Sequence, residues 1–266
     1  MGEIVFVGLG LYDDKGISLQ GIREVKTADK AFIELYTSLM PAFSIERFEK
    51  NIGKKLHAVS RKVLEEENGK IILEAAKKGK AVFLVPGDPL IATTHIALRI
   101  QAKKLGIPTR LVHGASILSA AIGLSGLHSY KFGKSVTIPF PEETCSETPY
   151  NVIVENKKAG LHTLCLLDIK ADEKRYLTIC EGLTALLKIE SKRNETVVSK
   201  DSLAVGIARA GSPFPTVKAD FVEKLLDYDF GEPPHTIVFP SGLHFMEAEA
   251  LIVLAHAPEN LREMME

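Results

Sequence analysis

The feature that most constrains this chain is a set of short, continuous apolar runs that end abruptly in glycine or proline turns. In the first half, Ile4 to Val7 is closed by Gly8-Leu9-Gly10, and Ala81 to Val85 is broken by Pro86-Gly87-Asp88-Pro89. Runs without polar alternation are typical of strands buried on both faces of a parallel sheet. Amphipathic segments separate these runs, so the sequence predicts an α/β fold with helices on both sides of the sheet.

Capping residues, glycine stops and apolar spacing give the expected elements. In the first half we expect helices beginning near Ser18 and Ser44, helices over 60–78, 94–105 and 115–124, and strands over 31–36 and 109–112. In the second half we expect strands over 135–140, 161–168, 203–208 and 236–239, with helices up to 158 and over 172–188 and 220–226. Strands follow one another more often in the second half, which favours a mixed sheet there.

Length, charge and cysteine content narrow the class of protein. A chain of 266 residues suits two domains, which we expect at 1–131 and 132–266. The formal net charge of −1 gives no reason to expect a nucleic-acid partner. No run reaches the roughly 18 apolar residues that a membrane span needs, and no secretory leader is visible, so we expect a cytoplasmic protein. Cys145, Cys165 and Cys180 form no C-x-x-C pair and are expected to be free thiols.

Two turns in the first half are candidate ligand-binding loops. Gly8 and Gly10 follow a strand, but Asp13 stands where the dinucleotide fingerprint needs a third glycine. Tyr12 likewise stands where Rossmann-type methyltransferases carry a glycine. Asp88 follows another strand, and ligands of open α/β sheets bind beyond the carboxyl ends of strands. The alternatives are a plain tight turn and an aspartate that serves only its own turn.

Three further positions have both a functional and a structural interpretation. Ser116 is placed to cap a helix, or its backbone could hold an adenosine. Ala210 follows an apolar run, and His235 precedes one; a lone histidine beside a strand is more often structural than catalytic. The sequence contains no H-E-x-x-H, Walker loop, G-x-S-x-G elbow or EF-hand, so no metal site is expected.

Taken together and in this order, the motifs resemble those of the diphthine synthase family, within the tetrapyrrole-methylase-like superfamily of methyltransferases. The match spans nearly the whole chain, and the long segments around Asp88 and Asp168 are its specific parts. The matching segments are GLGL (8–11), YTSLM (36–40), PGDPLIATTH (86–95), GASI (114–117), GLHSYKFG (126–133), GLHTLCLLDIK (160–170), ARAGS (208–212) and GEPPH (231–235).

The resemblance implies two α/β domains of the tetrapyrrole-methylase type, with the cofactor cleft between them, and a homodimer. It implies S-adenosylmethionine (SAM) as cofactor and S-adenosylhomocysteine as product. The short segment after Asp168-Ile169-Lys170 is similar to that of archaeal members. The cofactor contacts implied, residue by residue, are Leu11, Asp88, Ile91, Ser116, Ile117, Leu167, Ala210 and His235.

The resemblance also implies a protein substrate, translation elongation factor 2, whose target histidine already carries a 3-amino-3-carboxypropyl group. Repeated methylation of its amino nitrogen to a trimethylammonium would be a step of diphthamide biosynthesis. An amine with a pKa of about 8 keeps a useful neutral fraction near pH 7, and orientation can supply roughly 7–11 kcal/mol of barrier reduction. We therefore expect no indispensable catalytic side chain. Thr93, Thr94 and His95 either face the target amine or begin a helix.

Three alternatives remain at this point. A precorrin or cobalt-precorrin methyltransferase belongs to the same superfamily and would methylate ring carbon. A non-catalytic nucleotide-binding protein would share the loops without the reaction. A nicotinamide dehydrogenase is disfavoured by the missing third glycine.

Overall fold

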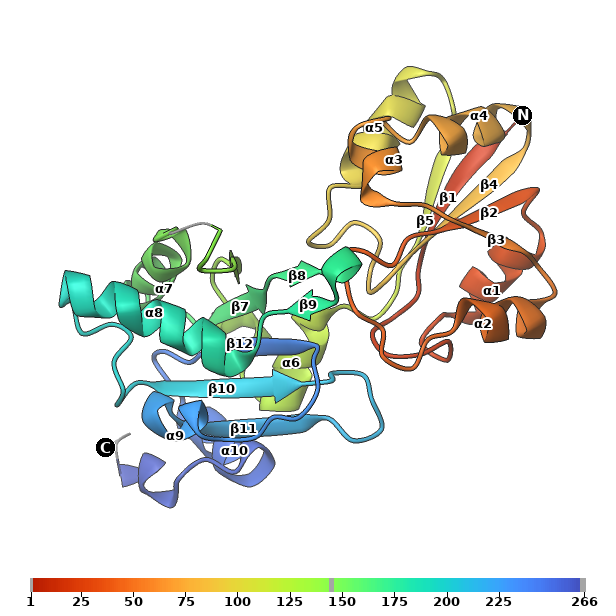
Figure 1. Ribbon diagram of the computed structural model, residues 1–266. Coiled ribbons are helices and arrows are strands. Elements are labelled where there is room, and N and C mark those ends of the chain that lie inside the picture. The colour runs from red at the N-terminus through yellow and green to blue at the C-terminus, as the bar shows by residue number, and fades with distance from the viewer. Residues whose placement is uncertain (1, 144–145, 264–266) are drawn as a thin grey trace. The chain divides into compact units, whose positions relative to one another are not determined.

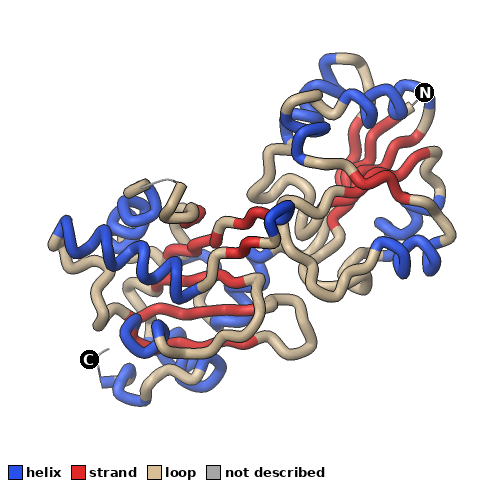
Figure 2. The backbone as a smooth tube through the Cα atoms, viewed as in Figure 1, coloured by secondary structure: helices blue, strands red, loops and turns tan. Residues whose placement is uncertain are grey.

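In the computed structural model, residues 2–143 and 146–263 are described (Figures 1 and 2). The chain divides into two compact units, one made of residues 1–117 and 171–173 and the other of 118–170 and 174–266. The domain boundary expected after residue 131 stays a prediction. Among the cysteines, Cys165 is buried and Cys180 is exposed, while Cys145 lies outside the described residues.

The first unit is built on a five-stranded sheet in the order β3-β2-β4-β1-β5. All four strand pairings are parallel, as the apolar runs predicted. The strands are β1 (Glu3–Gly8), β2 (Lys30–Ile33), β3 (Leu56–Ala58), β4 (Lys80–Val85) and β5 (Thr109–Val112). The helices are α1 (Leu19–Lys26), α2 (Ile45–Ile52), α3 (Arg61–Glu65), α4 (Lys70–Lys78) and α5 (Ile96–Lys104).

Helices cover both faces of this sheet, with α1 and α2 on one side and α3, α4 and α5 on the other (Figure 1). The side chains of β1 explain why, because alternate residues enter different cores. Phe6 packs in the cluster that contains Ile72 of α4, whereas Val5 packs in the cluster that contains Phe48 of α2. A strand buried on both faces needs apolar residues at its buried positions, which is the pattern of β1 and β4 after their partly exposed first residues, Glu3 and Lys80.

Two expected elements of the first unit are corrected by the structure. The single helix expected over 60–78 is two helices, because Asn68 (φ 53°) and Gly69 (φ 62°) take left-handed backbone conformations between them. The strand expected to reach Tyr36 ends at Ile33, because the side chain of Glu34 captures the next backbone N–H groups. The cap at Ser18 and the helix start near Ser44 are confirmed, and each serine side chain accepts a backbone hydrogen bond there.

The second unit contains a five-stranded sheet in the order β11-β10-β12-β7-β6. Only β6 and β7 are parallel within it, so the mixed sheet expected here is confirmed. Its strands are β6 (Val136–Ile138), β7 (Thr163–Leu167), β10 (Leu203–Ala208), β11 (Thr216–Phe221) and β12 (His235–Phe239), and β8 (Ile169–Lys170) pairs with β9 (Arg175–Tyr176). Its helices are α6 (Ile117–Ser125), α7 (Thr148–Lys158), α8 (Ile179–Arg193), α9 (Val222–Leu226) and α10 (Phe245–Ala255), with short 3₁₀ turns η1 (Ser129–Lys131) and η3 (Glu259–Leu261). The 3₁₀ turn η2 (Ala171–Glu173) is the segment assigned to the first unit.

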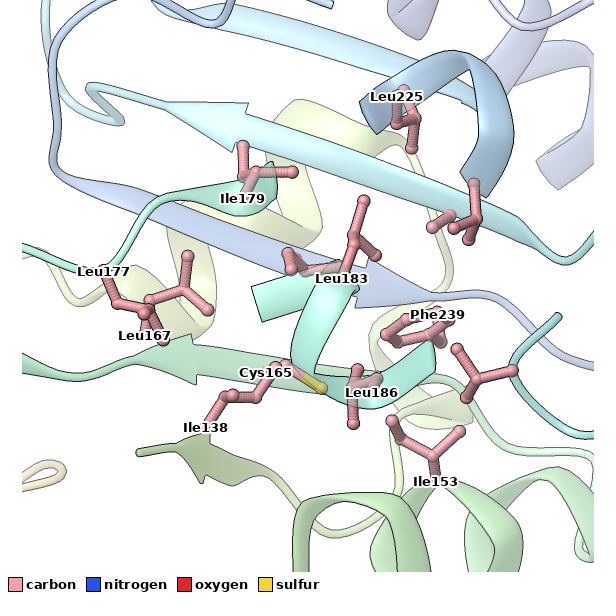
Figure 3. Close-up of a cluster of buried hydrophobic side chains, with 14 of the residues drawn as sticks. Ile138, Ile153, Cys165, Leu167, Leu177, Ile179, Leu183, Leu186, Leu225 and Phe239 are labelled. Carbon is pink, nitrogen blue, oxygen red and sulfur yellow. The ribbon is translucent and has the colours of Figure 1, made fainter. Parts of the chain in front are cut away.

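The core of the second unit lies between its sheet and helices α7, α8 and α9 (Figure 3). Leu183 and Leu186 of α8 lie in the same buried cluster as Cys165 of β7 and Phe239 of β12. Burial raises the pKa of the Cys165 thiol, so this cysteine behaves as an apolar core residue.

Other expectations for the second unit were wrong. The helix expected from Asp172 begins only at Ile179, because Thr178 and Glu181 form a reciprocal capping box there. Helix α10 and strand β11 were not expected at all, since α10 shows little amphipathic contrast and β11 is polar at alternate positions. No helix within the described ranges is long and apolar enough to cross a membrane.

Candidate functional site

The loops that follow β1 and β4 are joined by backbone hydrogen bonds. Gly10 N donates to Gly87 O at 3.3 Å, and Gly87 N donates to Gly10 O at 2.6 Å. Leu9 N donates to Val85 O at 2.8 Å, which continues the pairing beyond the strands. The glycine turn and the Pro-Gly-Asp-Pro turn of the sequence are therefore one structure at the carboxyl edge of the sheet.

The loop after β5 joins this structure through glycine contacts. A Cβ at Gly8 would lie 2.5 Å from Gly87 O and 2.6 Å from Gly114 N, and a Cβ at Gly114 would lie 2.4 Å from Gly87 O. Gly87 also has a φ of 67°, which side chains rarely adopt. Glycine is required here because three backbones meet, which is more than the simple strand-ending turn that Gly8 and Gly10 suggest.

Asp88 lies at the centre of the same edge and is 8% exposed. Its Oδ1 accepts a hydrogen bond from Leu90 N at 3.3 Å, so it does serve its own turn. Its Oδ2 is 2.7 Å from Nδ1 of His113, which follows β5. A carboxylate can accept about four hydrogen bonds, so Asp88 keeps acceptor capacity for a ligand.

The other residues predicted in the first unit lie on the same three loops. Leu11 follows β1 and is half-buried, while Ser116 and Ile117 are half-buried at the start of α6. Ile91 is 39% exposed, which is unusual for a large apolar side chain beside a buried carboxylate. This edge thus combines a polar acceptor with apolar surface, as a nucleoside site requires.

The three residues predicted in the second unit also share one sheet edge. Ala208 at the end of β10 is paired with His235 at the start of β12, and Thr236 is paired with Leu166 of β7. Leu167 directly follows Leu166, Ala210 lies two residues after Ala208, and both Leu167 and Ala210 are buried.

The imidazole of His235 is occupied at both nitrogens. Nε2 is 3.0 Å from Gly231 O, and Ile179 N donates to Nδ1 at 3.4 Å. Burial lowers the pKa of His235 below its usual range, and the charge of Arg209 lowers it further. A neutral ring whose nitrogens both bind backbone groups holds its loop in place and has no free position for proton transfer.

Arg209 fixes the same edge from the other side. It has a φ of 53°, and its guanidinium donates to the carbonyls of Phe230 and Glu232 and to the hydroxyl of Thr216. These bonds connect the loop after β10 to the loop before β12, so Ala210 and His235 are held by a common side chain.

Two buried side-chain atoms lack a hydrogen-bond partner within residues 2–143 and 146–263: the hydroxyls of Tyr36 and Ser212. Tyr36 lies on the loop after β2, and Ser212 lies on the loop after β10. Buried polar atoms are nearly always paired, so unpaired ones at a strand edge point to ligand binding. Sequence reasoning missed Tyr36, which it assigned to a strand, because only the tertiary structure shows that its hydroxyl is enclosed.

The segment that follows Asp88 leads into α5, so the helix start expected at Thr93 to His95 is confirmed, but the N-cap residue His95 makes no side-chain capping bond. The hydroxyl of Thr93 donates to Pro89 O at 3.0 Å, and that of Thr94 donates to Glu65 at 3.2 Å. His95 is buried, with its Nε2 3.1 Å from Glu34 Oε1.

A separate cavity of about 300 Å³ lies in the second unit and includes none of the predicted residues. Its lining includes Thr163 at the start of β7 and Phe239 at the end of β12, so it is at the opposite sheet edge from Leu167 and His235. We place the candidate residues of the second unit at the edge that carries Leu167 and His235. The loops held by Arg209 and the unpaired hydroxyl of Ser212 are at that edge. No cluster of metal-binding side chains is present in the part of the chain that the structure describes.

The fold and these loops define a class of protein. Residues 3–225 match the family described as Tetrapyrrole (Corrin/Porphyrin) Methylases. The chain is therefore a methyltransferase of this α/β class, and its mixture of a parallel sheet and a mixed sheet agrees with the fold predicted from the sequence.

More specific similarities extend over almost the full length. The chain is 48% identical over 269 residues to diphthine synthase of Methanosarcina mazei, covering 99% of this chain and 100% of that protein. It is 49% identical over 264 residues to diphthine synthase of Methanococcoides burtonii, covering 97% and 98%. A crystal structure of diphthine synthase superimposes with a TM-score of 0.89 at 43% identity, covering 98% of both chains.

The chain thus belongs to the diphthine synthase family and is a SAM-dependent methyltransferase. This membership supports the methylation step of diphthamide biosynthesis, and it does not favour the precorrin alternative.

Proposed function

We propose that this chain methylates the amino nitrogen of the 3-amino-3-carboxypropyl group on the target histidine of elongation factor 2, repeatedly, to a trimethylammonium. The observation that carries the proposal is the near full-length similarity to diphthine synthases, which includes the loops that build the candidate site. Elongation factor 2 is accordingly the proposed protein partner.

We propose that the residues that contact SAM are Leu11, Asp88, Ile91, Ser116, Ile117, Leu167, Ala210 and His235. The chemistry of the residues fits this ligand. Asp88 has acceptor capacity for a hydroxyl or amino group, and Ile91 offers exposed apolar surface for a base. Because residues 8, 87 and 114 are glycines, the backbone N–H and C=O groups of these loops can approach a bound ligand closely.

SAM supplies an activated methyl group on a sulfonium, and its transfer to the amine leaves a neutral thioether. The side chains of the site then have to orient the amine and exclude water, which can lower the barrier by roughly 7–11 kcal/mol. The amine loses a proton before each transfer, and its neutral fraction near pH 7 is sufficient for this. We propose no catalytic side chain, and His235 in particular has no unoccupied ring nitrogen.

We further propose that the protein acts in the cytoplasm as a homodimer, without a nucleic-acid partner. The family resemblance supports the dimer, and a net charge of −1 is consistent with a protein rather than a nucleic-acid substrate. Light scattering of the purified protein tests the dimer directly, and a monomer at all concentrations would contradict it.

The reaction is tested with SAM carrying an isotope-labelled methyl group. Elongation factor 2 with the 3-amino-3-carboxypropyl-histidine should acquire the label, whereas unmodified elongation factor 2 and a precorrin should not. Label on the precorrin alone would support the alternative substrate, and binding of SAM without any transfer would support a non-catalytic role.

A further inference from the structure

The loop after β2 is built against the loops of the proposed SAM site. Ile33 of β2 is paired with Leu84 of β4, and Glu34 N donates to Leu84 O at 3.2 Å. Further along, Ala42 N donates to Tyr12 O at 3.1 Å, which joins this loop to the one that carries Leu11. Residues 34–42 therefore lie at the carboxyl edge of the first sheet, beside the loops after β1 and β4.

A buried carboxylate holds this loop rigidly. Glu34 accepts hydrogen bonds from Tyr36 N at 2.9 Å, from Thr37 N at 3.0 Å and from the Thr37 hydroxyl. Its remaining contact is His95 Nε2 at 3.1 Å, from the segment that follows Asp88. Glu34 and His95 are both almost fully buried, so the position of Tyr36 is fixed by a network whose polar groups have partners.

Tyr36 is the member of this loop with an unused polar atom. Its side chain is buried, its ring packs edge-on against His95 at 6.1 Å, and its hydroxyl has no partner. Burial, together with the negative charges of Glu34 and Glu65, raises the pKa of Tyr36, so the hydroxyl stays protonated and can donate. An unpaired buried hydroxyl is destabilising, and a bound acceptor would remove that cost.

The positively charged side chain of Arg61 lies close to Tyr36. The guanidinium of Arg61 lies over the Tyr36 ring, 5.3 Å from its centroid, and the Arg61 side chain is exposed. No carboxylate among the described residues forms an ion pair with Arg61; the nearby Glu65 accepts a hydrogen bond from the Thr94 hydroxyl instead. A guanidinium and a protonated phenol together are donors for a carboxylate.

We propose that Tyr36 and Arg61 bind the carboxylate of the 3-amino-3-carboxypropyl group, and so place the neighbouring amine for methylation. This assignment rests on the function proposed above. The Tyr36 hydroxyl is enclosed beside the exposed Arg61 side chain, so a shift of this side chain would open the hydroxyl to the carboxylate. The methionine part of SAM carries a carboxylate too, so the test has to separate the two sources.

The test uses Tyr36→Phe and Arg61→Gln in the full-length protein. Each variant should raise the KM for elongation factor 2 bearing the 3-amino-3-carboxypropyl-histidine by about 10-fold or more, because a hydrogen bond to a charged group is lost. The Kd for S-adenosylhomocysteine should stay within about twofold of the wild-type value. Tyr36→Phe should not lower the melting temperature, because the hydroxyl has no partner to lose.

Tyr150→Phe is the matched control. Tyr150 is also buried, but its hydroxyl donates to Glu190 at 2.7 Å in the second unit. This variant should lower the melting temperature and leave the KM for the protein substrate unchanged.

A wild-type KM in Tyr36→Phe would overturn the inference while leaving the proposed function intact. Weaker S-adenosylhomocysteine binding with an unchanged KM would overturn it as well, by assigning the carboxylate to the cofactor. Absence of methyl transfer by the wild-type protein would instead refute the proposed function itself.

Discussion

The carboxylate of Asp88 and the imidazole of His113 are hydrogen-bonded, Oδ2 to Nδ1, at 2.7 Å across the carboxyl ends of β4 and β5. Asp88 is buried and His113 is largely exposed, so the histidine orients the aspartate from the solvent side. The pair joins the two loops that the glycine contacts bring together, and the carboxylate, with one partner on each oxygen, keeps acceptor capacity for a ligand.

Replacing Asp88 with alanine should weaken binding of S-adenosylhomocysteine by about 10–100-fold, because a charge-assisted hydrogen bond is removed. Isothermal titration calorimetry measures this directly. Asp29→Ala is the control, since Asp29 accepts a hydrogen bond from Lys80 N at the opposite edge of the same sheet. Unchanged affinity in Asp88→Ala would show that the carboxylate serves only its own loop.

Replacing His113 with alanine should have a smaller effect, a loss of about twofold to fivefold in the same affinity. The imidazole is exposed, and interactions between exposed groups contribute little. In the Asp88→Ala background the His113 substitution should add nothing further, which a double-mutant cycle by calorimetry detects. Fully additive effects would mean that His113 does not act through Asp88.

Gly114→Ala should destabilise the protein by about 2–4 kcal/mol, because its Cβ would lie 2.4 Å from Gly87 O with backbone on both sides. Urea unfolding measures the change. Gly123→Ala provides the control, since Gly123 lies in α6 with open space around its Cβ and should be neutral or slightly stabilising. Equal stability of the two variants would contradict the close meeting of the three loops.

Glu247 should make the protein sensitive to acid. Burial alone would raise its pKa, but hydrogen bonds from Lys131, from the backbone of His128 and His244, and from His162 outweigh burial and hold the pKa at about 2. A carboxylate with a lowered folded-state pKa stabilises the protein above its unfolded pKa of about 4.3 and loses that contribution as the pH falls toward 2.

The acid sensitivity is tested by comparing the wild type with Glu247→Gln. The contribution of this carboxylate is about 3 kcal/mol, so the variant should be less stable at neutral pH and should lose less stability between pH 5 and pH 2. Glu190, whose pKa is also about 2, should leave part of the pH dependence in place. Parallel stability curves for the two proteins would refute this role of Glu247.

Much of the fold follows from local sequence, and the failures have physical causes. Continuous apolar runs predicted the positions of β4 and β10, because strands buried on two faces have few polar residues at their buried positions. Polar β11 and the evenly apolar α10 carry no such local signal, and both depend on pairing and packing with distant segments.

The candidate site was predictable in part for a related reason. Asp88 and the glycine turns stand out because they interrupt apolar runs, and Ser116, Ala210 and His235 stand out beside such runs. Family resemblance added Leu11, Ile91, Ile117 and Leu167 as expected cofactor contacts. The role of Tyr36 could not be inferred from sequence, because its unpaired hydroxyl is a consequence of Glu34 redirecting the chain and of His95 packing on the ring.

The most direct test of the account is mass spectrometry of the target histidine peptide after incubation of modified elongation factor 2 with the purified protein and SAM. The account predicts successive addition of methyl groups to the 3-amino-3-carboxypropyl amine, ending in a trimethylammonium. A peptide mass that stays unchanged with active, SAM-binding protein would contradict it.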